Sequence, residues 1–400
     1  MGATGFGRRA VLGGVAALAH GGRAWGQGAQ PVRIGVLTDE GGPYASSGGA
    51  GSVAAARMAV QDFGGTVLGL PVEVLRADTQ NKPDVAGSIA RGWYDSGVDA
   101  ITDLPVTPVA AAVQQVARDK LRTVMITAAA VTEFTSKLCA PVSSHWADDT
   151  HALAAGTGRV VTEGGGRTWY FIAVDFSFGA ALQAEAAKVI EAAGGQVLGG
   201  TRFPLGNSDF SAQIVQARTS GAQVIGLAAV GGDQVNLIKQ AAEFGLQAGG
   251  KQTLAGFLVY LTDIHALGLE VAQGLRFPGS FYWDTDAGTR AFGQRFIVER
   301  RAMPTGNHAN VYAATLHFLR AMALAGTRDA VAVGRAMRAL PVRYFGTETA
   351  MRGDGRVLHD LVLYRVKAPG ESSGPWDLLA PLGTVPAGDA FLAMNPACTA

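Results

Sequence analysis

Apolar and polar positions alternate along most of the chain in a way that predicts short buried strands, each followed by a helix. The first 130 residues hold four compact apolar runs, a pattern typical of parallel strands covered on both faces, at 32–38, 71–77, 100–102 and 123–127. Helical stretches follow the first three runs, as at 83–96. This order predicts a parallel sheet with helices over its faces.

The same alternation restarts after residue 150. Residues 138–150 lack helical or strand periodicity, so we interpret them as a crossover between two units. Further strands are expected at 168–174, 196–203 and 224–229, each followed by a helix. Beyond residue 254 the pattern changes to three helices and a small β region that includes 361–367. Since 400 residues exceed what one core usually supports, we predict an α/β protein with two units.

Charge is nearly balanced, with 33 Lys and Arg against 32 Asp and Glu. A net charge of +1 offers no electrostatic attraction for nucleic acid or for an anionic membrane surface. Neither is therefore an expected partner.

The N-terminus predicts an export signal. Arg8 and Arg9 precede a short apolar run, and Ala24–Gly26 supplies small residues for cleavage. The twin arginines and the weakly apolar core resemble a Tat signal. The run is too short to span a bilayer, and no cysteine near the cleavage site provides for a lipid anchor. We expect residues 1–26 to be cleaved after Gly26 and the mature protein to be soluble in the periplasm.

The chain has two cysteines, Cys139 and Cys398. Export makes a disulfide between them chemically possible. Two free thiols, one of them on a disordered tail, are the alternative, and the sequence does not decide between them.

Candidate cofactor and catalytic motifs are weak. Residues 49–54 fit a loose G-x-G-x-x-A pattern, but about ten residues separate them from the preceding strand, whereas a dinucleotide site needs the motif at the strand's end. The seven histidines have no zinc spacing, and there is no G-x-S-x-G elbow. We therefore expect no cofactor, no metal and no catalytic residues.

The loops that follow the strands are better candidates for a binding site. Ligands of open α/β sheets bind beyond the carboxyl ends of the strands. At one such end, Thr107 and Pro108 open a helix, with Thr107 predicted as the N-cap, and the free N–H groups of a helix start can bind a carboxylate. Aromatic residues lie at several of the loops and suggest an apolar wall: Tyr44, Trp146, Phe176, Phe178, Tyr282 and Trp283.

Several longer motifs carry a family resemblance. They are IGVLTDEGGPY from Ile34, DTQNKPDVA from Asp78, VMITAAAVTEFT from Val124, DFSFGAAL from Asp175, SDF from Ser208 and IKQAAEFGL from Ile238. With these motifs, the chain from Val32 onward resembles the type I periplasmic binding proteins of ABC importers, in the branched-chain amino-acid (Leu/Ile/Val) family.

The resemblance implies two Rossmann-like lobes joined by three crossovers near 143–147, 276–282 and 344–355. Lobe 1 would comprise 31–143 and 254–342, lobe 2 would comprise 144–253 and 343–390, and 391–400 would be a tail. The ligand would be trapped between the lobes when they close.

The resemblance also implies where a ligand would lie. In the amino-acid binders a loop of hydroxyl residues and backbone N–H groups takes the α-carboxylate, and a Glu takes the α-ammonium. Here Thr107 supplies the hydroxyl, the next hydroxyl falls at Val131 or Thr132, and the Glu falls at Leu258 or nearby. The complete set expected to bind ligand is Tyr44, Thr107, Ala129, Thr132, Trp146, Phe178, Val230, Asp233, Leu258 and Trp283.

An apolar residue at the ammonium position favours an apolar or aromatic carboxylate, with a branched-chain amino acid as the alternative. The acids left to pair with an ammonium are Asp175, Asp233 and, near Leu258, Asp263. We therefore expect a monomeric, non-enzymatic binding protein that delivers a small molecule to ABC permease subunits. A ligand sensor and a periplasmic hydrolase are the competing functions.

Overall fold

The first sheet has six strands in the computed structural model, which describes residues 1–2, 30–246 and 251–398. Their order is β2 (Thr66–Val67), β3 (Leu70–Asp78), β1 (Val32–Thr38), β4 (Ala100–Asp103), β5 (Thr123–Ile126) and β6 (Ser143–His145). All neighbours are parallel except β2 and β3. The strands predicted from the apolar runs are present, and β6 adds a strand where an irregular crossover was expected.

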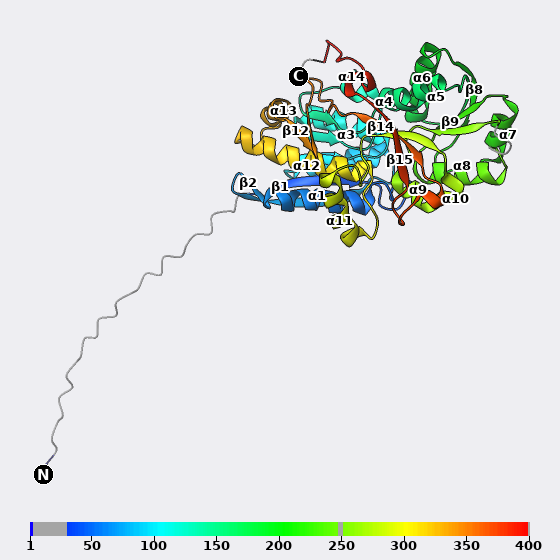
Figure 1. The fold of residues 1–400 in the computed structure, drawn as a ribbon. Helices are drawn as coiled ribbons and strands as arrows, with labels where there is room; N and C mark the ends of the chain where they lie inside the picture. Colours follow the sequence, from blue (N-terminus) through cyan, green and yellow to red (C-terminus); the bar gives the residue numbers. More distant parts are fainter. Residues whose placement is uncertain (3–29, 247–250, 399–400) are drawn as a thin grey trace. The chain divides into compact units, whose positions relative to one another are not determined.

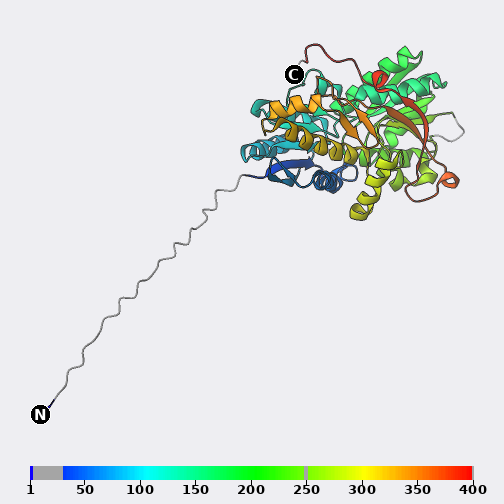
Figure 2. The same cartoon turned by 60° about the vertical axis from the view of Figure 1, so that its left-hand side comes forward.

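Helices from two distant parts of the chain cover this sheet. The first part supplies α1 (Gly49–Phe63), α2 (Pro83–Asp95) and α3 (Thr107–Lys120), and the later part supplies α11 (Ala287–Arg300), α12 (Gly306–Ala325) and α13 (Ala330–Ala339). The long α12 packs along α1, and Figures 1 and 2 both show these segments side by side. The buried faces of α1 and α12 share one apolar core with β1.

The second sheet has seven strands in the described part of the chain. Their order is β15 (Leu379–Val385), β14 (Leu361–Val366), β11 (Arg276–Gly279), β10 (Thr253–Gly256), β9 (Val224–Ala228), β7 (Thr168–Val174) and β8 (Gln196–Phe203). The strands from β8 to β11 are parallel, and β14 and β15 run antiparallel at the other edge.

The helices around the second sheet include one that the sequence pattern did not predict. Residues 150–163 form a continuous helix made of α4 (Thr150–Ala154), the π-helical turn η2 (Ala155–Arg159) and α5 (Val160–Glu163). The others are α6 (Ser177–Ala192), α7 (Ser211–Thr219), α8 (Gly231–Glu243), α9 (Leu261–Leu267), α10 (Leu269–Ala272) and α14 (Ala387–Ala390). Short 3-10 turns η1 (Thr132–Thr135) and η4 (Pro369–Glu371) and the hairpin of β12 (Val342–Tyr344) and β13 (Thr347–Thr349) complete the elements.

The division between the two units differs from the one predicted. Residues 254–342 were assigned to lobe 1, yet β10 and β11 lie in the second sheet, where β10 pairs with β9 along its length. The chain therefore returns to the first sheet only after β11. The prediction was wrong because a four-residue strand carries too little pattern to show which sheet it joins.

The segments that connect the sheets are joined to one another by hydrogen bonds. The His145 N–H donates to the Gly355 carbonyl at 2.8 Å, and the Ser280 N–H donates to Asp148 Oδ2 at 3.1 Å. The buried Arg356 guanidinium donates to His145 Nδ1 at 2.9 Å. The three connections thus form one bonded group.

Two predicted features, the export signal and a possible disulfide, lie toward the ends of the chain. The predicted export signal, residues 1–26, lies almost wholly outside the described residues, and no described helix is long and apolar enough to cross a membrane. Near the other end, Cys398 is disulfide-bonded to Cys139, with 6.0 Å between their Cα atoms.

Candidate functional site

A cavity with an empty volume of about 280 Å³ lies where strands of both sheets end. We call it the first cavity, and its lining residues are Tyr44, Pro105, Thr107, Ala128, Ala129, Ala130, Phe176, Phe178, Val230, Leu258 and Tyr260. Every one of them follows the carboxyl end of a strand, namely β1, β4 or β5 of the first sheet or β7, β9 or β10 of the second. This is the place where open α/β sheets bind ligands.

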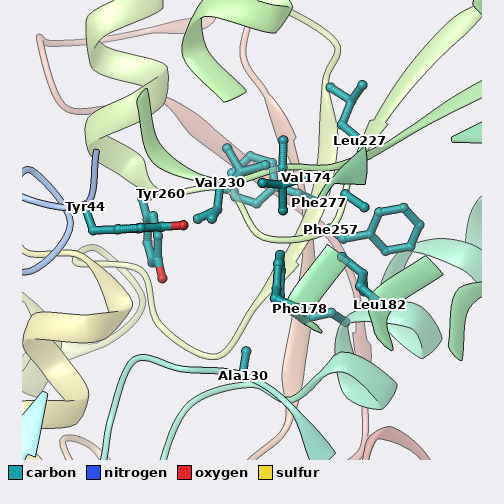
Figure 3. Close-up of a cluster of buried hydrophobic side chains, with 14 of the residues drawn as sticks. Tyr44, Ala130, Val174, Phe178, Leu182, Leu227, Val230, Phe257, Tyr260 and Phe277 are labelled. Carbon is teal, nitrogen blue, oxygen red and sulfur yellow. The ribbon is translucent and has the colours of Figure 1, made fainter. Parts of the chain in front are cut away.

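Tyr44 is held in the first cavity by the loop after β1. The Asp39 carboxylate accepts the N–H of Gly42 at 2.7 Å and that of Tyr44 at 2.9 Å, so it folds the loop around itself. Burial raises the pKa of the Tyr44 hydroxyl, and the nearby Asp233 and Asp39 raise it further. Tyr44 is therefore a neutral hydroxyl group. Figure 3 shows its side chain together with those of Tyr260 and Val230.

Tyr260 supplies the second hydroxyl, and its position is set by the start of α9. Its backbone N–H donates to Asp263 Oδ2 at 3.0 Å in the first turn of that helix. Its hydroxyl donates to Asn307 Oδ1 at 3.1 Å. Burial raises the pKa of Tyr260, and the negative charge of Asp263 adds to the effect, so this hydroxyl is also neutral.

Thr107 lines the first cavity, but its role in α3 differs from the prediction. The N-cap of α3 is Val106, which makes no side-chain capping bond, and Thr107 is the first helical residue. The prediction failed because the helix begins one residue earlier than the Thr-Pro pair suggested. The Thr107 side chain is consequently at the cavity wall and is not used as a cap.

The predicted site residues divide into two groups. Six line the first cavity: Tyr44, Thr107, Ala129, Phe178, Val230 and Leu258. Trp146 does not, because it is buried in the first sheet's core beside His317 and donates its indole N–H to Ser144. Trp283 donates to the Trp376 carbonyl instead, and Thr132 belongs to the 3-10 turn η1.

Among the described residues, none with an acidic side chain lines the first cavity. Asp233 was expected to do so, but its carboxylate accepts the Gly206 N–H at 2.9 Å. Asp263 caps α9, and burial raises its pKa to about 7. Asp103, at the end of β4, is also fully buried, and burial raises its pKa to about 6. None of these three acids is among the residues that line the cavity.

Sequence reasoning missed several lining residues, of which Tyr260 matters most. A strand followed by a loop was expected near 254–260 without a defined boundary, and β10 ends at Gly256, so Tyr260 follows it in a loop. With the end of β10 placed at Gly256, Tyr260 would have been recognised as one more aromatic residue in a loop that follows a strand. Pro105, Ala128 and Ala130 lie in loops that had been singled out, but nothing in their side chains marked them.

The lobes touch beside the first cavity. The Gly232 N–H, at the start of α8, donates to the Pro43 carbonyl in the loop after β1 at 3.2 Å. Gly231 has φ of +62°, and a Cβ there would lie 2.4 Å from the Pro43 oxygen. Such a close approach needs glycine. The structure is therefore that of a closed cleft.

The described residues contain no group of three His, Cys, Asp or Glu side chains that could hold a metal ion.

Residues 31–374 match the family model described as periplasmic binding protein. This chain belongs to the periplasmic binding protein family. Its members bind solutes and are not enzymes, so the predicted family, fold class and non-enzymatic character are confirmed for this binding protein.

Solved structures agree with the family assignment. A periplasmic binding protein from Burkholderia mallei is 41% identical, with a TM-score of 0.89 over 92% of this chain and 98% of that one. A branched-chain amino acid ABC transporter periplasmic ligand-binding protein from Burkholderia xenovorans is 37% identical, with a TM-score of 0.81 over 90% and 96%. A Rhodopseudomonas palustris ABC transporter solute-binding protein, solved with benzoate, shares the fold at 17% identity, with a TM-score of 0.80 over 89% and 96%. No curated protein sequence matches the chain.

Proposed function

We propose that this binding protein is the solute-binding component of an ABC importer and that it takes an apolar or aromatic carboxylate without an ammonium group. The described residues that line the first cavity include no acid, and this observation carries the proposal. An ammonium group enclosed there would have no carboxylate to pair with, and an unpaired buried charge is very costly. Val230 and Leu258 instead offer apolar contact.

The opposite end of the ligand would be held by Thr107 and the N–H groups at the start of α3. Helix starts favour anions because their first N–H groups have no partner within the helix. Ala128, Ala129 and Ala130 line the same space. The ring or chain of the ligand would then contact Phe176 and Phe178.

A branched-chain amino acid is the second candidate, because the relative from Burkholderia xenovorans is described as a branched-chain amino acid transporter component. A thermal-shift screen separates the two, since a ligand that binds the native state raises the melting temperature. We expect benzoate-like, cinnamate-like and 2-keto acids to raise it. A strong shift with leucine or valine and none with these acids would refute the proposal.

Partners and location complete the proposal. We infer export with cleavage after Gly26, a monomeric mature protein, and docking of the closed form on permease subunits in the inner membrane. The relative's description as an ABC transporter component supports the permease partner. Ligand uptake lost on deleting the gene supports transport, whereas intact uptake with a lost transcriptional response would favour a sensor.

A further inference from the structure

The end of the chain passes from one lobe to the other. It starts at α14, which is fixed to the lobe of the second sheet: the Ala387 N–H donates to Asp360 Oδ1 at 2.8 Å, and Ala390 shares a small apolar cluster with Leu361 of β14. Residues 391–398 then leave this lobe. Figures 1 and 2 both show the red end of the chain running from α14 toward the side of α13.

The other end of this segment is fixed to the lobe of the first sheet. Cys398 is bonded to Cys139, which lies between η1 and β6. The neighbouring Ala140 is buried against Ala330, at the start of α13. Because β6 and α13 both belong to the first sheet's lobe, residues 391–398 and the disulfide form a fourth covalent connection between the lobes. We call this segment the strap.

Between its two ends the strap is loosely held. Leu392 and Met394 are 45% and 42% exposed, so even its apolar side chains are not packed in a core. Within the described chain, one hydrogen bond joins residues 392–398 to other residues, from the Arg352 guanidinium to the Leu392 carbonyl. The disulfide is therefore the bond that attaches the strap to the first sheet's lobe.

The strap begins beside the connections about which the lobes would rotate. The Phe391 ring lies 4.4 Å from the Arg356 guanidinium and meets the His359 ring edge-on at 5.4 Å. These two residues tie the third connection to the first, because Arg356 bonds to His145 and His359 bonds to Asp148 Oδ1 at 2.7 Å. A restraint on the strap thus acts next to the hinge.

The strap is short. Its eight residues, from Phe391 to Cys398, can span at most about 29 Å when fully extended. Part of that length is folded into a turn, in which the Cys398 N–H donates to the Asn395 carbonyl at 2.9 Å. A rotation that moves the two ends apart must first undo this turn and then meets the limit of the chain.

We propose that the strap, closed by the disulfide, restricts how far and in how many orientations the two lobes open. The closed orientation satisfies the strap, so the strap removes open orientations and shifts the population toward closure. This inference concerns the range of opening and goes beyond the proposed function, since it does not depend on which solute the cleft takes.

Pulsed electron paramagnetic resonance on the ligand-free protein tests the proposal. Spin labels on Lys82→Cys and Ser208→Cys report the distance between the lobes, because these exposed positions lie in loops after β3 and β8, beyond the carboxyl ends of strands in different sheets. We expect a longer and broader distance distribution when Cys139→Ser and Cys398→Ser are added than when the disulfide is intact.

A lengthened strap is the matched control. An insertion of about six alternating Gly and Ser residues after Ala393 adds flexible length and keeps both cysteines. The bond already joins positions 259 residues apart, and the entropy of loop closure depends only on the logarithm of loop length, so the melting temperature should hardly change. The distance distribution should nevertheless lengthen and broaden, as without the disulfide.

The insertion also tests the proposal if the variant without cysteines does not fold. Equal distance distributions in the unmodified and lengthened proteins would overturn the inference, even if loss of the disulfide changes the distribution, because the bond would then act through stability and not as a strap. Either result leaves the proposed function standing, since no ligand is used.

Discussion

Thr107 is the side chain on which the proposed carboxylate site depends most directly, because it is at the cavity wall and does not cap α3. Thr107→Val keeps the shape and removes the hydroxyl. A hydrogen bond to a charged group contributes about 1.5–3 kcal/mol, so we expect affinity to fall roughly tenfold or more. Titration calorimetry measures the loss.

Thr107→Ser is the matched control, since it keeps the hydroxyl and removes only the methyl group. It should retain most of the affinity. If Thr107→Val binds as tightly as the unmodified protein, the carboxylate is held elsewhere.

Asp263 gives a prediction on pH dependence. Burial raises the pKa of its carboxyl from 3.8 to about 7, so the folded state binds a proton more tightly than the unfolded state. Its contribution to the free energy of unfolding is therefore largest below pH 4, falls as the pH rises from 4 to 7, and is constant above that. One pKa unit corresponds to about 1.4 kcal/mol.

Asp263→Asn removes this titration, and its amide oxygen can still accept the Tyr260 N–H. Urea unfolding at pH 5 and pH 8 should show the variant gaining stability relative to the unmodified protein as the pH rises. Parallel pH profiles for the two proteins would show that Asp263 does not titrate in this range.

The sequence predicted which loops form the site, but not which side chains of those loops face the cavity. The ends of β1, β4, β5, β7 and β9 were identified, and six of the chosen side chains line the first cavity. Trp146 and Trp283 were chosen as aromatic residues of the loops, but Trp146 is buried in the first sheet's core and Trp283 donates to the Trp376 carbonyl. The direction of a loop side chain depends on backbone angles that no residue pattern encodes.

The contact between α8 and the loop after β1 gives a prediction at the scale of elements. A Cβ at Gly231 would lie 2.4 Å from the Pro43 oxygen, in the loop after β1 on the other side of the cleft. Gly231→Ala should therefore oppose closure and lower ligand affinity by tenfold or more, as calorimetry can measure. A ligand that binds the closed form shifts the population toward it, so a less stable closed form weakens binding.

Two control variants separate this clash from other effects. At Gly232 a Cβ would lie 3.9 Å from the nearest Pro43 atoms, so Gly232→Ala should bind nearly normally. Gly268 has φ of +74° with open space around it, so Gly268→Ala introduces backbone strain without a clash, and this strain costs about 1–3 kcal/mol in stability. An unchanged affinity in Gly231→Ala would mean that the ligand binds without this contact.

Elements with strong patterns were predictable, and short ones were not. The seven-residue run of β1 and the helix α2 agree with expectation within a residue. β6 has three residues and β10 has four, so neither is long enough to show a periodic pattern of apolar and polar residues. The helix over 150–163 begins within a stretch interpreted as irregular and contains a π turn, which disrupts the spacing of its buried positions.

At the scale of the whole molecule, the bond between Cys139 and Cys398 joins positions 259 residues apart. A closure of that length restricts the unfolded chain and stabilises the fold by roughly 5 kcal/mol before strain. Cys139→Ser and Cys398→Ser should lower the melting temperature by the same amount. The double variant should have the same melting temperature as either single variant. Two titratable thiols per unreduced, unfolded chain would show that the bond does not form.

The central claim is that the cleft takes a carboxylate that lacks an ammonium group. Calorimetry with matched pairs tests it most directly, because phenylalanine and 3-phenylpropanoate, like leucine and 4-methyl-2-oxopentanoate, share a carbon skeleton and differ at the α-carbon. We predict that the ammonium-free member of at least one pair binds, and that neither amino acid binds comparably. Tight binding of leucine or phenylalanine, with no binding of its partner, would contradict the account.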